Sequence, residues 1–253
     1  NTEEERLLGV SLTGIMDNEL TNGTKHGLER TLESLREIAV ETNREWSAVF
    51  GIPQSTAITC VKPSGTVSQL VDSSSGIHPR HSAYYIRTVR GDNKDPLTQF
   101  MIDSGVPSEP DFMKPDTQTV FSFPMKSPTT STLRDDMTAI EQLEMWLTYQ
   151  RYWCEHKPSV TVSVRDDEWM EVGAFVFEHF DEMSGVSFLP HSDHTYQQAP
   201  YQECTEAVYN DFRSKFGHIN WNKFRDYEKE DTTSGSQTFA CSGDSCEIVD
   251  IGA

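Results

Sequence analysis

Apolar and helical patterns alternate at the start of the chain. Residues 8–15 form a short apolar run bounded by turn-favouring residues, which is typical of a buried strand. From about residue 24 to residue 50, apolar residues recur at helical spacing until a Gly-Ile-Pro sequence stops the helix. Residues 56–61 are apolar again. The pattern predicts a strand–helix–strand unit with parallel strands and a right-handed crossover.

The middle of the chain reads differently. Residues 73–133 are rich in Pro, Gly, Ser, Thr and Asp, so we expect an irregular excursion with one or two short strands, at 84–89 and 119–123. Helical periodicity returns over residues 135–156, and a strong strand follows at 159–164.

A second strand–helix–strand unit follows. Three acidic residues at 166–168 open a helix that runs to about residue 182, and Gly185 can serve as its C-cap. Residues 186–189 form the next strand, and a last helix is expected from about 202 to 216. These elements predict an α/β fold with a largely parallel set of strands.

The composition changes at the C-terminus. From about residue 228 the chain consists mainly of Glu, Asp, Thr, Ser and Gly. We predict a folded body over residues 1–227 and a flexible tail over residues 228–253.

The charge balance limits the classes of partner. The chain has 21 Lys and Arg against 40 Asp and Glu, a net charge of -19 at pH 7, which opposes binding to nucleic acid or to an anionic membrane. No apolar run approaches the roughly 18 residues of a membrane span, and the N-terminus does not have the pattern of a signal peptide. We expect a cytoplasmic protein, in the host cytoplasm if viral, that starts inside a longer chain.

The cysteines fall into two groups. Five are too few and too unevenly spaced for a disulfide framework, which favours a reducing compartment. We expect Cys60, Cys154 and Cys204 to be small buried hydrophobes. Cys241 and Cys246 are separated by Ser-Gly-Asp-Ser and can reach disulfide geometry. A redox relay, half of a zinc site and two incidental exposed thiols remain open as interpretations.

A candidate phosphate loop, Lys62-Pro-Ser-Gly-Thr-Val-Ser68, follows the strand at residues 56–61. It should lie at the strand's C-terminal end, where α/β folds bind ligands. Gly65 lets a ligand approach the backbone, and Ser64 to Ser68 offer consecutive N–H groups and three hydroxyls that suit a phosphate. The P-loop pattern is missing, and a plain turn between strand and helix is the alternative.

Histidines and an arginine gather in an otherwise acidic chain. Arg80 could bind a phosphate oxygen, assisted by His78 and His81. His191 and His194 form a second His-x2-His pair after a predicted strand. Four histidines could in principle bind zinc, but nothing in the sequence fixes their geometry, so we assign no metal.

Taken together, these segments resemble the adenosylcobalamin-dependent (class II) ribonucleotide reductases, in particular the monomeric ribonucleoside-triphosphate reductases. The order and spacing of the segments carry the resemblance over nearly the whole chain. The matching segments are residues 8–17, 57–70, 76–82, 157–164 and 198–203 and the terminal Cys-x4-Cys.

The resemblance implies a ten-stranded α/β barrel with a flexible redox tail. In this family a cysteine radical generated from adenosylcobalamin abstracts the ribose 3′ hydrogen, and a cysteine pair supplies the electrons that replace the 2′-hydroxyl. By the same resemblance, Cys241 and Cys246 match the tail pair that re-reduces the active-site disulfide and is reduced by thioredoxin. The residues implied to bind the phosphates of a ribonucleoside triphosphate are Pro63, Ser64, Gly65, Thr66, Val67, Ser68, His78 and Arg80.

The chain also departs from the family pattern. The radical cysteine of the family lies well upstream of the phosphate loop, and no residue before Cys60 matches it. We therefore expect only the C-terminal third of a reductase, which needs the missing N-terminal part as a partner. Two alternatives are a non-catalytic redox or interaction module and a zinc-binding domain that uses the tail cysteines with His191 and His194.

Overall fold

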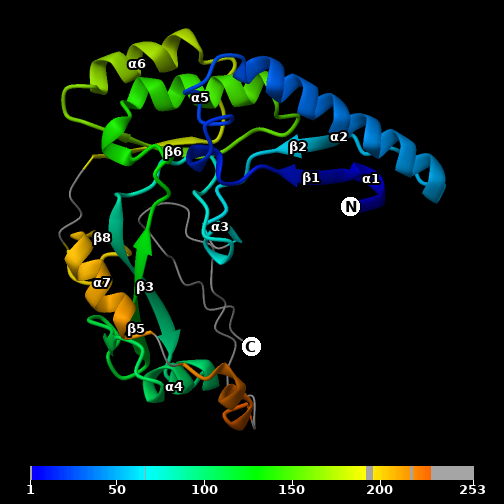
Figure 1. Cartoon of the computed structure of the whole chain (residues 1–253). Coiled ribbons are helices and arrows are strands. Elements are labelled where there is room, and N and C mark those ends of the chain that lie inside the picture. Colours follow the sequence, from blue (N-terminus) through cyan, green and yellow to red (C-terminus); the bar gives the residue numbers. More distant parts are fainter. Residues whose placement is uncertain (1, 66, 192–195, 217–218, 229–253) are drawn as a thin grey trace. The chain divides into compact units, whose positions relative to one another are not determined.

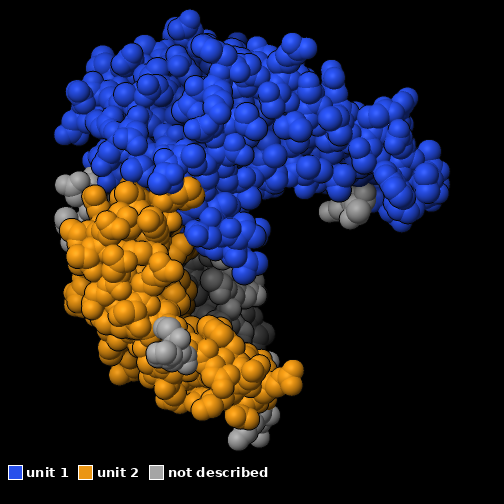
Figure 2. Space-filling view, in the orientation of Figure 1, with its two compact units in different colours: residues 1–80, 129–192, 240–246 blue, residues 81–128, 193–239, 247–253 orange. Residues whose placement is uncertain are grey.

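The computed structural model describes residues 2–65, 67–191, 196–216 and 219–228. These residues form two compact units (Figure 2): unit 1 contains the described residues of 1–80 and 129–192, and unit 2 those of 81–128 and 193–239. Cys241, Cys246 and nearly all of the predicted tail lie outside the described residues. The predicted boundary between residues 227 and 228 therefore stays a prediction.

The first half of unit 1 is the predicted strand–helix–strand unit. After a short α1 (Thr2–Glu5), β1 (Leu7–Ser11) connects through α2 (Leu28–Phe50) to β2 (Ala57–Cys60), and the two strands pair in parallel as predicted. Gly51 ends α2 in the left-handed conformation.

The predicted strand at residues 8–15 is too long. The left-handed Gly14, with φ 71°, breaks the extended backbone, and η1 (Ile15–Asp17) follows as a single turn of 3-10 helix. Ile15 and Met16 are buried there. This turn also brings Asp17 into the candidate site described below.

The second half of unit 1 repeats the arrangement. After η2 (Arg134–Asp136), α5 (Ala139–Tyr152) precedes β6 (Val160–Val164), and α6 (Trp169–Glu178) leads to β7 (Val186–Pro190). Strands β6 and β7 pair in parallel, which confirms the second predicted crossover.

The expected role of Gly185 is wrong. His179, not Gly185, caps α6, and Gly185 lies immediately before β7 with φ 66°. A Cβ at this position would lie 2.9 Å from the carbonyl oxygen of Pro158. The glycine therefore allows a close approach between two chain segments.

Helices cover the strands of unit 1. Helix α2 packs on β2, and α5 packs on β6 and contacts α2 and α6 (Figure 1). Trp146 and Tyr149 of α5 are fully buried with Val162 of β6 in a single hydrophobic cluster. Because burial of such large side chains contributes about 1.5–3 kcal/mol each, this cluster stabilises the unit.

Unit 2 contains an antiparallel sheet that the sequence analysis did not predict. Its strand order is β4–β5–β3–β8, formed by β4 (Ser108–Pro110), β5 (Gln118–Lys126), β3 (Tyr84–Asp92) and β8 (Tyr201–Glu203). β3 and β5 pair along all nine residues of each strand. The strands expected at 84–89 and 119–123 are therefore present but longer than expected, and the expected largely parallel arrangement is wrong for this unit. One face of an antiparallel sheet can be solvated, so polar residues do not prevent strand formation.

Helices complete unit 2. Asp95 caps α4 (Pro96–Asp103), a helix inside the segment that we expected to be irregular. The predicted last helix is shorter than expected, because β8 occupies its start and α7 spans Glu206–Ser214. The final η3 (Trp221–Asp226) packs its aromatic residues against Phe100 of α4. No helix in the described ranges has the length and apolar character needed to cross a membrane.

Candidate substrate-binding loop

The candidate phosphate loop starts at the C-terminal end of β2, as predicted. Val61 is buried, and the chain then emerges so that Lys62, Pro63 and Gly65 are exposed. Thr66 lies outside the described residues, and α3 (Val67–Leu70) follows as a single short turn of helix.

Internal hydrogen bonds close the loop. Ser64 has a left-handed backbone, with φ 48°. Its carbonyl oxygen accepts hydrogen bonds from both the amide of Ser68, at 3.2 Å, and the Ser68 hydroxyl. The Ser73 amide donates to the Ser68 carbonyl at 2.9 Å, and the hydroxyls of Ser68 and Ser75 lie 2.8 Å apart. These bonds within residues 64–75 therefore contribute to the shape of the loop.

Gly65 and Gly76 differ in the space that a side chain would have at their positions. A Cβ on Gly76 would lie 2.6 Å from the carbonyl oxygen of Lys62, so the fold itself requires a glycine there. A Cβ on Gly65 would have no heavy atom within 4 Å, and Gly65 is not left-handed. The fold therefore does not require Gly65, and the space beside it is open to a ligand.

Arg80 is buried below the loop. Its side chain is 2% exposed, and its Nε and Nη2 donate to the two carboxylate oxygens of Asp17 at 2.9 and 2.8 Å. Nη2 also donates to the Asp72 carbonyl at 2.7 Å, and Nη1 to the Asp72 carboxylate at 3.2 Å. The arginine therefore connects η1 to the chain that follows α3.

His78 is also engaged within unit 1. Its Nδ1 lies 2.8 Å from the Ser75 carbonyl oxygen, and its Nε2 accepts the amide of Thr161 in β6 at 3.0 Å. These partners require the neutral tautomer with the proton on Nδ1. Burial lowers the pKa of His78, and the hydrogen bond to Ser75 only partly offsets that effect.

The other predicted histidines are in different surroundings. His81 belongs to unit 2, where its ring stacks on Tyr201 at 5.7 Å between centroids. His191 Nε2 lies 3.2 Å from a carboxylate oxygen of Asp135, and His194 lies outside the described residues. Among the residues that the structure describes, no three His, Cys, Asp or Glu side chains are grouped to hold a metal ion.

The three described cysteines are free thiols. Cys60 is 2% exposed in β2, whereas Cys154 and Cys204 are only half-buried. Burial raises the pKa of Cys154 to about 12, with a further contribution from Cys60, and burial also raises the pKa of Cys204. Thiols with raised pKa values are weak nucleophiles, so Cys154 and Cys204 are poorly suited to thiol chemistry.

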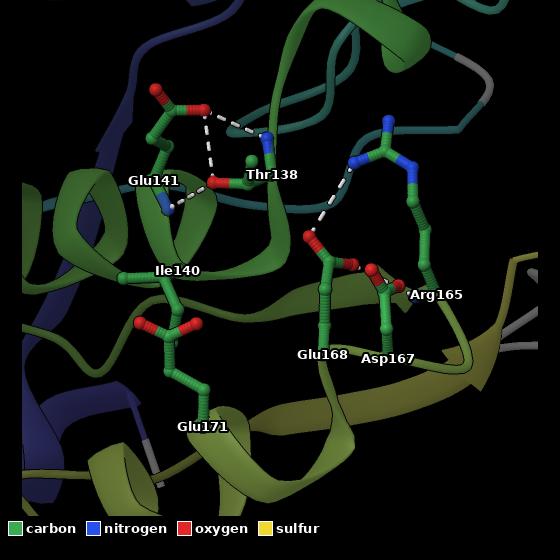
Figure 3. Close-up of a pocket in the computed structure, with 7 residues that line it drawn as sticks. All are labelled: Thr138, Ile140, Glu141, Arg165, Asp167, Glu168 and Glu171. Carbon is green, nitrogen blue, oxygen red and sulfur yellow. Dashed lines mark hydrogen bonds and ion pairs between the residues drawn. The ribbon is translucent and has the colours of Figure 1, made fainter.

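A separate hollow of about 440 Å³ lies beside the start of α5 and α6 (Figure 3). Its carboxylates hold helix ends: Glu141 accepts from the amide and hydroxyl of Thr138 at 2.8 and 2.9 Å, and Glu168 accepts from the amide of Arg165 at 2.8 Å. The lining residues are Thr138, Ile140, Glu141, Arg165, Asp167, Glu168 and Glu171. An excess of carboxylates makes this hollow unsuitable for a phosphate.

The sequence analysis missed the partners of Arg80. Asp17 and Ser131 lie 63 and 51 positions from Arg80 in the sequence, and Asp17 accepts the Ser131 hydroxyl at 2.7 Å. The available signal was an acidic residue two positions after the apolar run at residues 8–15.

Comparisons with known proteins identify relatives of the whole chain. A Dictyostelium discoideum protein named probable adenosylcobalamin-dependent ribonucleoside-triphosphate reductase is 30% identical over 250 residues, which cover 96% of this chain and 32% of the relative. The Euglena gracilis adenosylcobalamin-dependent ribonucleoside-triphosphate reductase is 29% identical over 243 residues, covering 95% of this chain and 33% of the relative. No family model matches the chain.

The fold agrees with these relatives. The crystal structure of a B12-dependent (class II) ribonucleotide reductase superposes with a TM-score of 0.76 at 23% identity, covering 92% of this chain and 36% of that chain. The chain spans about a third of the length of the curated relatives that it matches. The resemblance predicted from the sequence is therefore confirmed. Nearly the whole chain is similar to a segment that makes up about a third of the length of each adenosylcobalamin-dependent ribonucleoside-triphosphate reductase.

Proposed function

We propose that this chain is the C-terminal third of a class II ribonucleoside-triphosphate reductase, an enzyme that makes deoxyribonucleotides for DNA synthesis, and that it acts in the cytoplasm. The observation that carries the proposal is the loop after β2, which is held by internal hydrogen bonds and has open space beside Gly65. The chain that contains it is similar to one of these reductases along 96% of its length. In the complete enzyme, β1, β2, β6 and β7 would be four strands of a ten-stranded α/β barrel.

The loop would bind the triphosphate of the substrate. Backbone N–H groups and hydroxyls between Pro63 and Ser68 can hold an anion without a large positive charge, which suits a chain with a net charge of -19. Ser68 itself closes the loop, because its amide and hydroxyl donate to the Ser64 carbonyl. Gly65 would let the phosphate approach the backbone closely. Lys62, which is exposed at the start of the loop, adds one nearby positive charge.

Cys241 and Cys246 would form the dithiol relay. One thiolate attacks the active-site disulfide of the reductase, and the second resolves the mixed disulfide. Two electrons and two protons then reside on the active-site thiols, and the tail pair is left as a disulfide. Thioredoxin would reduce that disulfide by the same exchange.

The described residues do not by themselves fit adenosylcobalamin, the cofactor in the relatives' names. Two hollows on unit 1 measure about 440 and 460 Å³, within the range for drug-sized ligands and small for a corrin. Both have carboxylates in their lining. We therefore derive no step through the cofactor and assign its binding to the rest of the enzyme.

The missing N-terminal part is the proposed partner of β1. All five residues of β1 are exposed, including Leu7, Leu8 and Val10, and β1 pairs with β2 alone among the described strands. An exposed apolar strand edge is a template for a further strand. The relatives contain about twice as much additional chain as is present here.

Nucleotide protection of the loop tests the binding proposal. We expect CTP to slow hydrogen exchange in peptides that cover residues 62–74. Gly65→Ala should fold normally, because its Cβ meets open space, but should lose most of this protection. Gly173→Ala in α6 is the matched control, since its Cβ also meets no atom within 4 Å. Absence of protection by CTP in the unsubstituted chain would contradict the proposal.

Peptide mapping tests the relay. We expect a Cys241–Cys246 disulfide in the oxidised chain that thioredoxin, its reductase and NADPH open. If the two thiols stay unpaired, the relay is wrong. If the disulfide is opened by thioredoxin while the loop ignores CTP, the chain is a redox module without substrate binding.

A further inference from the structure

The strongest unexplained feature is a buried ion-pair network below the phosphate loop. Arg80 lies at its centre, with a side chain that is 2% exposed, and the Asp17 side chain is 13% exposed. Burying charges costs free energy unless each is paired and hydrogen-bonded, so such a network needs a reason.

Asp17 connects three separate segments of unit 1. Its carboxylate accepts two hydrogen bonds from Arg80, one from the Ser74 amide at 2.7 Å and one from the Ser131 hydroxyl at 2.7 Å. Burial opposes ionisation of Asp17, but the hydrogen bonds from Arg80, Ser131 and Ser74 outweigh it and hold its pKa below the usual value. The carboxylate is therefore charged at neutral pH.

The network holds the base of the loop from two sides. Arg80 binds the carbonyl of Asp72, a residue with a left-handed φ of 49°, at the point where the chain leaves α3. Asp17 binds the next turn through the Ser74 amide. From η1, the amide of Met16 donates to the Ser74 hydroxyl at 3.1 Å.

We propose that the Asp17–Arg80 pair is a positioning device, which holds the phosphate loop in its binding shape through Asp72 and Ser74 and does not touch the phosphates itself. This inference rests on the proposed function and replaces the expectation that Arg80 binds substrate. Two carboxylates neutralise the single guanidinium, and a phosphate would have to displace them to reach it.

If Arg80 contacts the phosphate directly, Asp17→Asn should keep or strengthen anion binding, whereas it should weaken binding if the pair positions the loop. Asp17→Asn removes a negative charge from beside Arg80. If Arg80 bound phosphate, the freed guanidinium would bind an anion as tightly as before or more tightly. If the pair positions the loop, the same substitution loosens the loop and weakens binding.

The experiment measures two quantities on the full chain. Binding of inorganic tripolyphosphate is measured by calorimetry, and the flexibility of residues 62–74 by hydrogen exchange. For Asp17→Asn we expect about tenfold weaker binding, a change of about 1.4 kcal/mol, and faster exchange in the loop. Ser131→Ala removes one hydrogen bond to Asp17 and should show a smaller change in the same direction. If Asp17→Asn fails to fold, Ser131→Ala still tests whether the network holds the loop.

Glu182→Gln is the matched control. Glu182 accepts a similar arginine fork from Arg151, with Nε at 2.7 Å, on the exposed surface of unit 1. Its substitution should change neither readout. Arg80→Lys keeps the charge but cannot form the fork, so it should behave like Asp17→Asn.

Two results would overturn the inference. Unchanged loop exchange in Asp17→Asn would show that the pair does not hold the loop. Unchanged or tighter tripolyphosphate binding in Asp17→Asn, with weaker binding in Arg80→Lys, would assign Arg80 to the phosphate. A chain without substitutions that binds no tripolyphosphate would instead contradict the proposed function, while the exchange measurement still tests the positioning role.

Discussion

Strands β3 in unit 2 and β6 in unit 1 both contain buried residues, yet their backbone groups are satisfied in different ways. β3 has a strand on each side, with β5 paired along its whole length and β8 along part of it. Among the described strands, β6 pairs with β7 alone. At Thr161, the amide donates to His78 and the carbonyl accepts from Gln142 at 3.3 Å.

β2 resembles β6 in this respect. It pairs with β1 on one side. The amides of Ile58 and Thr59 donate to one carboxylate oxygen of Glu155 at 2.9 and 3.2 Å. Any residue can form the backbone ladder around β3, whereas at β2 and β6 particular side chains, among them Glu155, His78 and Gln142, bond backbone groups of the strands. We therefore expect substitutions of edge partners to cost more in unit 1 than in unit 2.

The largest effect is expected for Glu155→Ala. The buried amides of Ile58 and Thr59 would lose a charged acceptor, which should lower the free energy of unfolding by about 2–4 kcal/mol. Glu155→Gln keeps one acceptor oxygen and should cost less. Urea denaturation measures both, and Glu41→Ala in the exposed ion pair with Arg44 is the control. If Glu155→Ala and the control unfold with equal free energy, the backbone of β2 does not depend on the Glu155 side chain.

A pH-dependent effect is expected at His78. Its pKa in the folded state lies below the ordinary value of 6.5 because the ring is buried, so the unfolded chain takes up a proton first as pH falls. Stability from this group is complete above pH 6.5 and falls by up to about 1.4 kcal/mol per pH unit below it, toward the folded pKa.

Thermal unfolding between pH 7.5 and 5.5 measures this effect as the difference between the unsubstituted chain and His78→Gln. Glutamine can still accept the Thr161 amide and does not titrate. The inference about β6 fails if both chains lose stability equally over this range.

The smallest effect is expected in unit 2. The Thr88 hydroxyl of β3 donates to the Ala199 carbonyl at 3.0 Å, but the backbone ladder of β3 does not depend on this contact. Thr88→Val should lower the free energy of unfolding by about 0.5–1.5 kcal/mol. Urea denaturation under the conditions used for Glu155→Ala allows a direct comparison. A loss as large as that of Glu155→Ala would mean that unit 2 also depends on individual side chains.

The predicted elements are correct where the signal is local. The end of α2 was predictable because its apolar period stops at a glycine and a proline follows, and α5 because its period is uninterrupted. β3 was harder to predict, since Arg87, Arg90 and Asp92 give it a polar composition. Its length becomes evident only from its pairing with β5.

The same distinction holds for the candidate site. Residues 62–68 became a candidate phosphate loop because they follow β2, and ligands bind at the C-terminal ends of parallel strands. The surroundings of Arg80 do not follow from any local pattern, because Asp17 and Ser131 reach it through tertiary structure. An arginine next to a phosphate loop suggests a ligand contact until its partners are known.

The network around Asp17 also has a consequence for the order of events during synthesis. Asp17 and Arg80 leave the ribosome first, and Ser131 follows 51 residues later, a delay of about 3–10 s at roughly 5–20 residues per second. During that interval the loop lacks one of its anchors, and β6 has not yet been made. The loop should therefore reach its native shape in the growing chain only after Ser131 has been made, whereas β3 and β5, which precede Ser131, can begin to pair earlier.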